Sequence, residues 1–92
     1  MMFIVISYDV LDDKRWLKIS KILESYGKRV QFSVFECNLT QSQLIKLQER
    51  IKKVVVTKED SVRFYELCEK CLTRVATIGN IPITTDPEYF LV

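Results

Sequence analysis

The chain has 92 residues, of which 48% are hydrophobic, and this size suffices for one domain with a modest core. It contains no histidine, which excludes Ser-His-Asp and Cys-His catalysis, histidine-ligated zinc and a histidine general base. Its two glycines are too few for a P-loop or a dinucleotide-binding loop. The 14 basic and 12 acidic residues leave a formal charge of only +2, so contact with nucleic acid would depend on a local patch.

The apolar segments are too short for a membrane protein. None approaches the roughly 18 residues of a membrane span, and the apolar start lacks the charged flank and cleavage signal of a secretory peptide. We therefore expect a cytoplasmic protein with no membrane partner. The three cysteines fit reduced thiols better than a disulfide framework. Cys68 and Cys71 form a C-x-x-C pair, but with Cys37 they are one ligand short of a closed zinc site, which favours an ordinary solvated turn.

The first predicted element is a buried strand over residues 2–8, which is rich in Phe, Ile and Val. It presents the carboxylate of Asp9 at its C-terminal end. A carboxylate on such a rigid element suits the binding of a divalent metal directed at a phosphate. Taken alone, an aspartate in this position is also typical of a turn or a helix cap.

A helix is predicted over residues 13–26, capped by an aspartate at 12 or 13 and stopped by Gly27. Between residues 28 and 39 the apolar alternation changes phase near residues 33–35, which predicts a strand broken by a bulge or a tight turn. Thr40 and Gln43 form the signature of a capping box. The helix that follows has an inner face marked by Leu44, Leu47, Ile51 and Val55.

The C-terminal third is predicted to contain a hairpin. Residues 61–67 alternate like a strand, and residues 74–78 are predicted to form the strand paired with it, closing at a Gly-Asn pair. The tail over residues 81–92 holds both prolines and ends in an apolar segment, which we expect to add a strand to a partner or to a sheet edge. The chain is thus divided into a domain over residues 1–80 and a tail over residues 81–92.

This order of elements predicts an α+β fold of the ferredoxin-like type (βαββαβ) with an extra C-terminal strand. Two helices would cover one face of an antiparallel sheet, and the other face would need cover as well. A second copy would supply that cover most simply, giving a two-fold homodimer. The same symmetry would pair the two Asp9 carboxylates.

Three segments and one arginine carry a resemblance to a known family: residues 8–10 (YDV), Arg15, residues 27–36 (GKRVQFSVFE) and residues 60–65 (DSVRFY). Along nearly the whole chain, they resemble the small CRISPR-associated endoribonuclease, the dimeric partner of the adaptation integrase. The resemblance implies a ferredoxin-like homodimer in which the aspartate ending the first strand, here Asp9, binds a divalent metal at the dimer interface. It also implies metal-dependent cleavage of single-stranded RNA or double-stranded DNA, and a role in acquiring new spacers.

On this hypothesis the two Asp9 carboxylates hold one Mg²⁺, or Mn²⁺, which activates a water and neutralises the scissile phosphate. Five further residues are expected to contact nucleic acid: Tyr8, Arg15, Arg29, Ser33 and Phe35. The arginines would clamp phosphates, the serine would donate to a phosphate, and an aromatic ring would pack on a sugar or a base. The alternatives are that the arginines are solvated surface charges and that the aromatic rings belong to the core or to the dimer interface.

Two other classes of function stay open. The first is a non-catalytic dimeric bridge that holds DNA in the spacer-integration complex, in which Asp9→Asn would leave spacer acquisition unharmed. The second is a generic ferredoxin-like regulatory or toxin module, which would show neither metal dependence nor integrase binding. In a metal-dependent nuclease, by contrast, Asp9→Asn abolishes cleavage while the fold stays intact.

Overall fold

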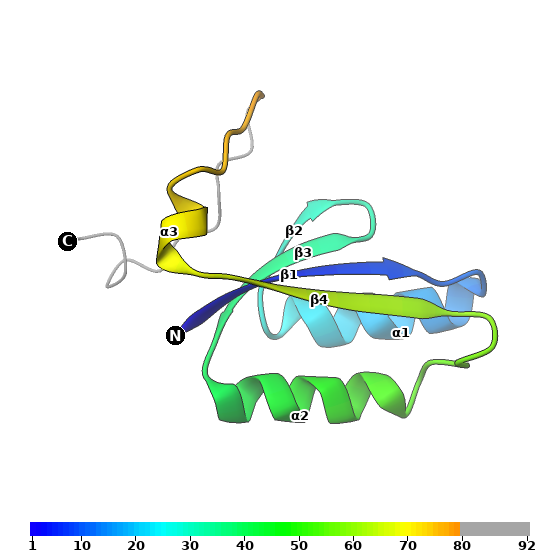
Figure 1. The fold of residues 1–92 in the computed structure, drawn as a ribbon. Helices are drawn as coiled ribbons and strands as arrows, with labels where there is room; N and C mark the ends of the chain where they lie inside the picture. The colour runs from blue at the N-terminus through cyan, green and yellow to red at the C-terminus, as the bar shows by residue number, and fades with distance from the viewer. Residues whose placement is uncertain (80–92) are drawn as a thin grey trace.

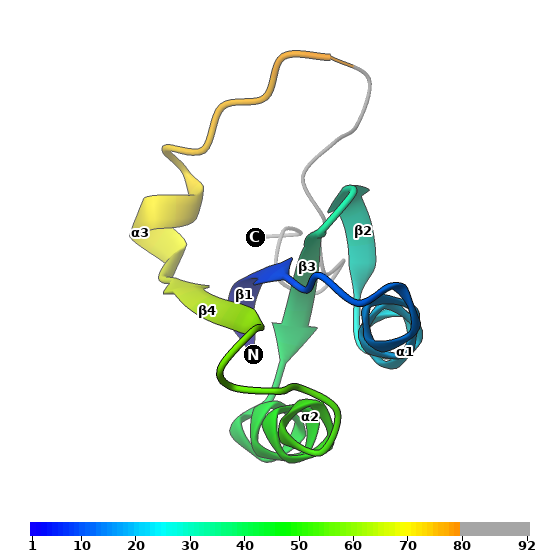
Figure 2. The same ribbon diagram turned by 90° about the vertical axis from the view of Figure 1, so that its right-hand side faces the viewer.

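A computed structural model describes residues 1–79, which form a layer of strands and a layer of helices (Figure 1). The elements are β1 (Met2–Asp9), α1 (Asp13–Glu24), β2 (Lys28–Gln31), β3 (Val34–Leu39), α2 (Gln41–Lys52), β4 (Ser61–Leu67) and α3 (Glu69–Leu72). The four strands form one antiparallel sheet in the order β2-β3-β1-β4. α1 and α2 lie side by side against one face of it (Figure 2). This arrangement confirms the predicted α+β fold of the ferredoxin-like type, while the predicted tail over residues 81–92 lies outside the described residues.

The core forms between the sheet and the two helices because alternate side chains of each strand point to the same face. On β1, Ile4, Ile6 and Tyr8 are buried on the helix side. The other fully buried hydrophobic members of this cluster are Ile19 and Leu23 from α1, Phe35, Cys37 and Leu39 from β3, and Leu47 from α2. Each large aliphatic or aromatic side chain buried in this way contributes roughly 1.5–3 kcal/mol. No helix among the described residues is long and apolar enough to cross a bilayer.

Both long helices begin at side-chain caps. The carboxylate of Asp12 accepts a hydrogen bond from the backbone N–H of Arg15 at 3.0 Å and starts α1. At α2 the Thr40 hydroxyl accepts from the Gln43 N–H at 3.2 Å, and the Gln43 side chain accepts from the Thr40 N–H at 2.9 Å. This reciprocal pair is the predicted capping box.

Gly27 has a different role from the one predicted. α1 ends at Glu24, and Gly27 has no positive φ, so it does not stop the helix through a left-handed conformation. Instead, a Cβ at this position would clash with the Sγ of Cys37 and the carbonyl oxygen of Glu36. The absence of a side chain therefore lets the chain between α1 and β2 approach the backbone of β3.

The break between β2 and β3 confirms the predicted change of phase. The two strands are joined by a turn at Phe32 and Ser33, and the register of their pairing shifts between Arg29 and Gln31, which marks a β-bulge. This irregularity places an aromatic side chain at the tip of the hairpin, where Phe32 is 75% exposed.

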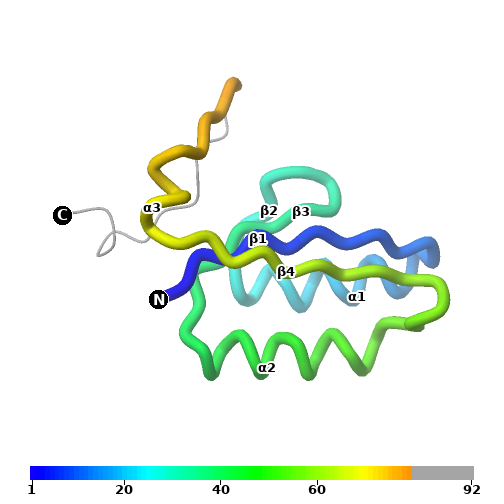
Figure 3. The backbone as a smooth tube through the Cα atoms, viewed as in Figure 1, coloured from blue at the N-terminus to red at the C-terminus, as the bar shows by residue number. Residues whose placement is uncertain are grey.

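The predicted strand over residues 74–78 is wrong. Cys68 caps the short helix α3, and the chain continues in turns in which the N–H of Arg74 donates to the Cys71 carbonyl at 3.0 Å and that of Val75 to the Leu72 carbonyl at 3.2 Å. α3 leads the chain away from the end of β4 on the side opposite α2 (Figure 3). Within residues 1–79, β4 therefore pairs only with β1 and its other edge is unpaired.

Candidate metal and nucleic-acid site

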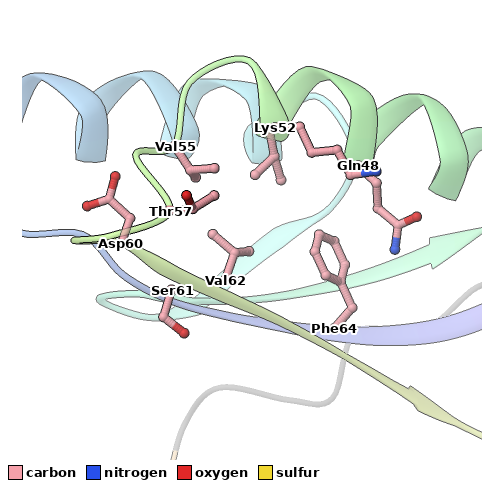
Figure 4. A pocket seen from close by; sticks show the side chains of 9 residues that line it. Gln48, Lys52, Val55, Thr57, Asp60, Ser61, Val62 and Phe64 are labelled. Carbon is pink, nitrogen blue, oxygen red and sulfur yellow. The ribbon is translucent and has the colours of Figure 1, made fainter.

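Asp9 ends β1 and points to the face of the sheet that the helices leave open. Alternation along β1 places Ser7 on the same face, and the antiparallel register pairs Asp9 with Ser61 and Ser7 with Arg63 of β4. Figure 4 shows Ser61 directed away from α2, whereas its neighbour on β4, Val62, points toward that helix. A hollow of about 340 Å³ forms here, lined by Ser7, Asp9, Ser61, Arg63 and Tyr65.

The hollow combines one carboxylate, one guanidinium and three hydroxyl groups. The carboxylate of Asp9 is exposed, and no side chain among residues 1–79 forms an ion pair with it. Arg63, which like every guanidinium is charged at neutral pH, donates a hydrogen bond to the Tyr65 hydroxyl at 3.3 Å, and this interaction raises its pKa. An available carboxylate thus lies beside a fixed positive charge, which suits a divalent metal next to a phosphate.

The described part of one chain does not complete a metal site. It contains no group of three or more His, Cys, Asp and Glu residues arranged to hold an ion. Mg²⁺, however, keeps several waters and is usually bound through one or two carboxylates. The donor chemistry of Asp9, Ser7 and Ser61 therefore fits magnesium if a second Asp9 from another copy completes the site.

Tyr8 and Phe35 lie on the other side of the sheet from Asp9. Their side chains are 3% and 0% exposed, and their ring centroids are 6.2 Å apart in the core. The Tyr8 hydroxyl lies 2.6 Å from the Ser20 hydroxyl, which satisfies it inside the protein. The predicted stacking of either ring on a sugar or a base is therefore not supported, because neither ring can reach nucleic acid without leaving the core.

Arg29 is held against aromatic rings at the β2–β3 hairpin. Its guanidinium carbon lies 4.9 Å from the centroid of the Phe35 ring and 5.1 Å from that of Trp16. It donates to the Phe32 carbonyl and, at 3.4 Å, to the Tyr8 hydroxyl. About a third of its side chain is exposed (32%), and one terminal nitrogen lies 3.7 Å from a carboxylate oxygen of Glu24, whose side chain is 60% exposed.

Ser33 and Phe32 occupy the same hairpin. The hydroxyl of Ser33 accepts a hydrogen bond from the Trp16 indole at 3.0 Å, which leaves its own proton for another acceptor. The Phe32 ring is stacked on Trp16, with centroids 4.5 Å apart. Phe32 is therefore the accessible aromatic side chain of this region, rather than part of the core.

Arg15 is already paired with carboxylates. Its Nε lies 2.8 Å from the Oδ2 of Asp60, and one of its terminal nitrogens lies 2.9 Å from the Oε2 of Glu59. The hydrogen bond to Arg15, with a second one from the Val56 N–H, lowers the pKa of Asp60, and the same bond raises that of Arg15. A phosphate would have to displace these two carboxylates to bind Arg15. The contacts of Arg15 instead join α1 to the loop before β4.

A second hollow, of about 480 Å³, lies between α2 and β4 (Figure 4). Val62 and Phe64 point into it from β4, and Val55 and Lys52 line it from the other side. Its one carboxylate, that of Asp60, is engaged by Arg15. The hollow is therefore mostly apolar, and its carboxylate is not free to act as an acid or a base.

Sequence reasoning thus selected Asp9 as a candidate but missed its neighbours in the hollow. These are Ser7, Ser61, Arg63 and Tyr65. The signal was available in the period-two spacing of residues 61, 63 and 65, which places them on one face of a strand. What was missing was the pairing of β4 beside β1, which only the sheet topology supplies.

Comparison with known proteins finds relatives along nearly the whole chain. The family model described as "CRISPR associated protein Cas2" matches residues 2–75. A curated relative from Synechocystis sp., named CRISPR-associated endoribonuclease Cas2 3, is 46% identical over 92 residues, which is 100% of both chains. The crystal structure of Streptococcus pyogenes Cas2 superposes with a TM-score of 0.75 at 36% identity, covering 85% of this chain and 100% of that one. A chain of a partial Cas6-RT-Cas1–Cas2 complex gives a TM-score of 0.78 at 34% identity, covering 92% and 99%.

The family match extends from the first residue of β1 to beyond α3 and so includes the Asp9 hollow, the β2–β3 hairpin and the pair of Arg15 and Asp60. The relative from Synechocystis sp. is similar to this chain along the whole sequence. On both grounds, the chain belongs to the CRISPR-associated Cas2 family.

Proposed function

We propose that this protein is a CRISPR adaptation protein and that, as a homodimer, it cleaves phosphodiester bonds of single-stranded RNA or double-stranded DNA in a metal-dependent reaction. The observation that carries the proposal is the exposed carboxylate of Asp9, which forms no ion pair within residues 1–79, beside Arg63 in the hollow on the open face of the sheet. The names of curated relatives, which are called endoribonucleases, support nuclease activity in general.

The homodimer supplies what one chain lacks. The open face of the sheet and the edge of β4 that pairs with no strand of residues 1–79 are surfaces on which a second copy can pack. A two-fold axis near the hollow would bring two Asp9 carboxylates together to hold Mg²⁺, or Mn²⁺. When bound, the metal would lower the pKa of a coordinated water and offset the negative charge of the phosphate.

The residues around Asp9 have distinct tasks in this proposal. Arg63 binds a phosphate through its forked donors, and its hydrogen bond to Tyr65 holds the guanidinium in place. The hydroxyls of Ser7 and Ser61 donate to a phosphate oxygen or to a water at the site.

A second contact with nucleic acid is proposed at the β2–β3 hairpin. There Arg29 binds a flanking phosphate, the free proton of Ser33 adds a hydrogen bond, and the exposed ring of Phe32 packs on a sugar or a base. Phe32 thereby takes the place that the sequence assigned to Phe35. Arg15 contributes indirectly, because its pairing with Asp60 positions the start of β4.

The decisive experiment compares Asp9→Asn with Asp13→Asn, a matched control that removes another exposed carboxylate outside the hollow. Cleavage and binding of labelled single-stranded RNA and double-stranded DNA are measured with Mg²⁺, Mn²⁺ or EDTA. We expect wild type and Asp13→Asn to cleave in Mg²⁺ or Mn²⁺, and Asp9→Asn to bind as they do but to cleave at least about 100-fold more slowly. Cleavage that survives in Asp9→Asn or in EDTA would overturn the proposal.

Arg63→Gln serves as a second variant in the same assay. It removes the positive charge of the hollow but retains a hydrogen-bonding side chain, so we expect weaker binding and a shallower dependence of binding on salt. If affinity and salt dependence are unchanged, Arg63 does not bind nucleic acid. This result would not affect the role of Asp9, which the Asp9→Asn variant tests separately.

A non-catalytic bridge is the second candidate function. It is favoured by the similarity to a chain of a partial Cas6-RT-Cas1–Cas2 complex and by the single carboxylate that residues 1–79 supply to the hollow. In this case the dimer holds DNA between integrase subunits, and Asp9→Asn acquires new spacers as wild type does. A loss of spacer acquisition in Asp9→Asn, with binding to DNA and integrase retained, would decide for the enzyme.

A further inference from the structure

Two thiols face each other at the junction of β4 and α3, apart from the hollow around Asp9. Cys68 directly follows the last residue of β4 and caps α3, and Cys71 lies one helical turn further on. Both side chains are exposed, and the two sulfur atoms are 3.4 Å apart. The C-x-x-C spacing, which the sequence suggested to be an ordinary turn, thus brings a pair of accessible sulfurs together.

The geometry suits a disulfide. A disulfide bond requires an S–S distance of about 2.05 Å and Cβ atoms roughly 3.5–4.5 Å apart. Residues three apart on a helical turn lie on the same face, so rotation of the two side chains brings the sulfurs closer. The turn itself is formed already, because the N–H of Leu72 donates to the Cys68 carbonyl at 3.0 Å and that of Cys71 donates to the Cys68 sulfur at 3.4 Å.

The two thiols are not equivalent. The backbone N–H and the thiol of Cys71 lower the pKa of Cys68, whereas the hydrogen bond with Cys68 raises the pKa of Cys71. Lys70 and Arg74 line a hollow of about 190 Å³ together with the two cysteines, so two positive charges face an approaching molecule. Since a thiolate is the attacking species in thiol–disulfide exchange, Cys68 is the nucleophile of the pair.

Cys37 provides an internal contrast. It is fully buried, and burial raises the pKa of its thiol to about 12. A thiol in this state is neither accessible nor ionised at neutral pH, so it does not exchange.

We propose that Cys68 and Cys71 form a redox-active dithiol that exchanges with a small anionic disulfide of the glutathione type. The Cys68 thiolate attacks one sulfur of oxidised glutathione, the S–S bond of glutathione breaks, and one glutathione leaves as its thiolate. Cys71 then loses its proton and attacks the Cys68 sulfur of the mixed disulfide, which releases the second glutathione. One protein disulfide and two glutathione thiols result, and the two protons of the protein thiols end on the released glutathione.

The test uses the reduced full-length protein incubated with oxidised glutathione, quenched with acid and alkylated, with masses measured over time. We expect wild type to lose the two alkylatable thiols of Cys68 and Cys71 without retaining glutathione, while Cys37 is alkylated only after denaturation. Cys71→Ser is expected to stop at one glutathione adduct on Cys68. Cys68→Ser, the matched control, is expected to react at least about tenfold more slowly than Cys71→Ser, because Cys71→Ser retains the backbone N–H that lowers the pKa of Cys68.

Three outcomes would overturn the proposal: wild type that stays unmodified, wild type that accumulates glutathione adducts or disulfides between chains, and Cys68→Ser that reacts as fast as Cys71→Ser. Both positions are exposed, so the serine variants are expected to fold, and thermal unfolding of each checks this. Neither cysteine lines the hollow around Asp9, so the result is independent of the proposed nuclease activity.

Discussion

The Nε of Arg15 lies 2.8 Å from the Oδ2 of Asp60, whose side chain is completely buried although the two residues are 45 positions apart in the chain. The same oxygen accepts a hydrogen bond from the Val56 N–H at 2.9 Å. This pair joins the first turn of α1 to the loop that leads into β4. Since β4 carries Ser61 and Arg63 into the hollow, the contact helps to place those residues beside Asp9.

Replacing Asp60 tests the structural task of this pair. Asp60→Asn removes a negative charge from a buried oxygen that accepts two hydrogen bonds, so we expect a lower free energy of unfolding in urea at pH 7. Glu59→Gln is the matched control. Its side chain is 57% exposed, and we expect it to change the stability little.

The pH dependence follows from the lowered pKa of Asp60. Because the carboxyl is more acidic in the folded than in the unfolded chain, its stabilisation is present above about pH 4 and is lost as the pH falls through the folded-state value. The difference in unfolding free energy between wild type and Asp60→Asn should therefore shrink on acidification. A difference that stays constant between pH 7 and pH 3 would contradict this assignment.

The two phenylalanines of the β2–β3 region offer a direct comparison of core and surface. Phe35 is 0% exposed, and we expect Phe35→Ala to lower the free energy of unfolding by about 3–5 kcal/mol because it leaves a cavity. Phe32 is 75% exposed, and Phe32→Ala should cost no more than about 1 kcal/mol, mostly through the lost contact with Trp16. Urea unfolding measures both values. Equal losses would mean that the hairpin packs differently.

The three thiols should differ in reactivity. Ellman's reagent is expected to titrate two thiols per chain in native buffer, those of Cys68 and Cys71, and the third after addition of urea. The physical reason is the burial of Cys37, which raises its pKa to about 12 and keeps it from the reagent. Rapid reaction of all three thiols in native buffer would show that the sheet opens near β3.

Magnesium should favour the dimer if two Asp9 carboxylates share the ion. By linkage, a ligand that binds only the dimer shifts the association equilibrium toward it. We expect Mg²⁺ to raise the dimer fraction of wild type in sedimentation velocity at low protein concentration, and to have no such effect on Asp9→Asn. A shift of the same size in both proteins would assign the effect to ionic strength rather than to a shared site.

The sequence by itself determined much of the fold, because the signals involved are local. The capping box at Thr40 and Gln43 marks the start of α2, and the change of apolar phase near residues 33–35 indicates the turn between β2 and β3. The position of Asp9 at the end of β1 also follows from the local pattern. The predicted strand over residues 74–78 was wrong, because a short apolar alternation does not reveal that Cys68 caps a helical turn.

Only the tertiary structure decided which side chains share a site. Whether Tyr8 or Asp9 faces the helices depends on which face of the sheet the helices cover. Whether Arg15 is free to bind a phosphate depends on the carboxylate of Asp60, which lies in a loop distant in the sequence. Arg63 joins Asp9 because β4 pairs with β1, a contact between strands separated by two helices and two other strands. The spacing of residues along a chain reveals the periodicity of a single helix or strand. Which helices and strands pack together depends instead on how they bury their apolar faces against one another.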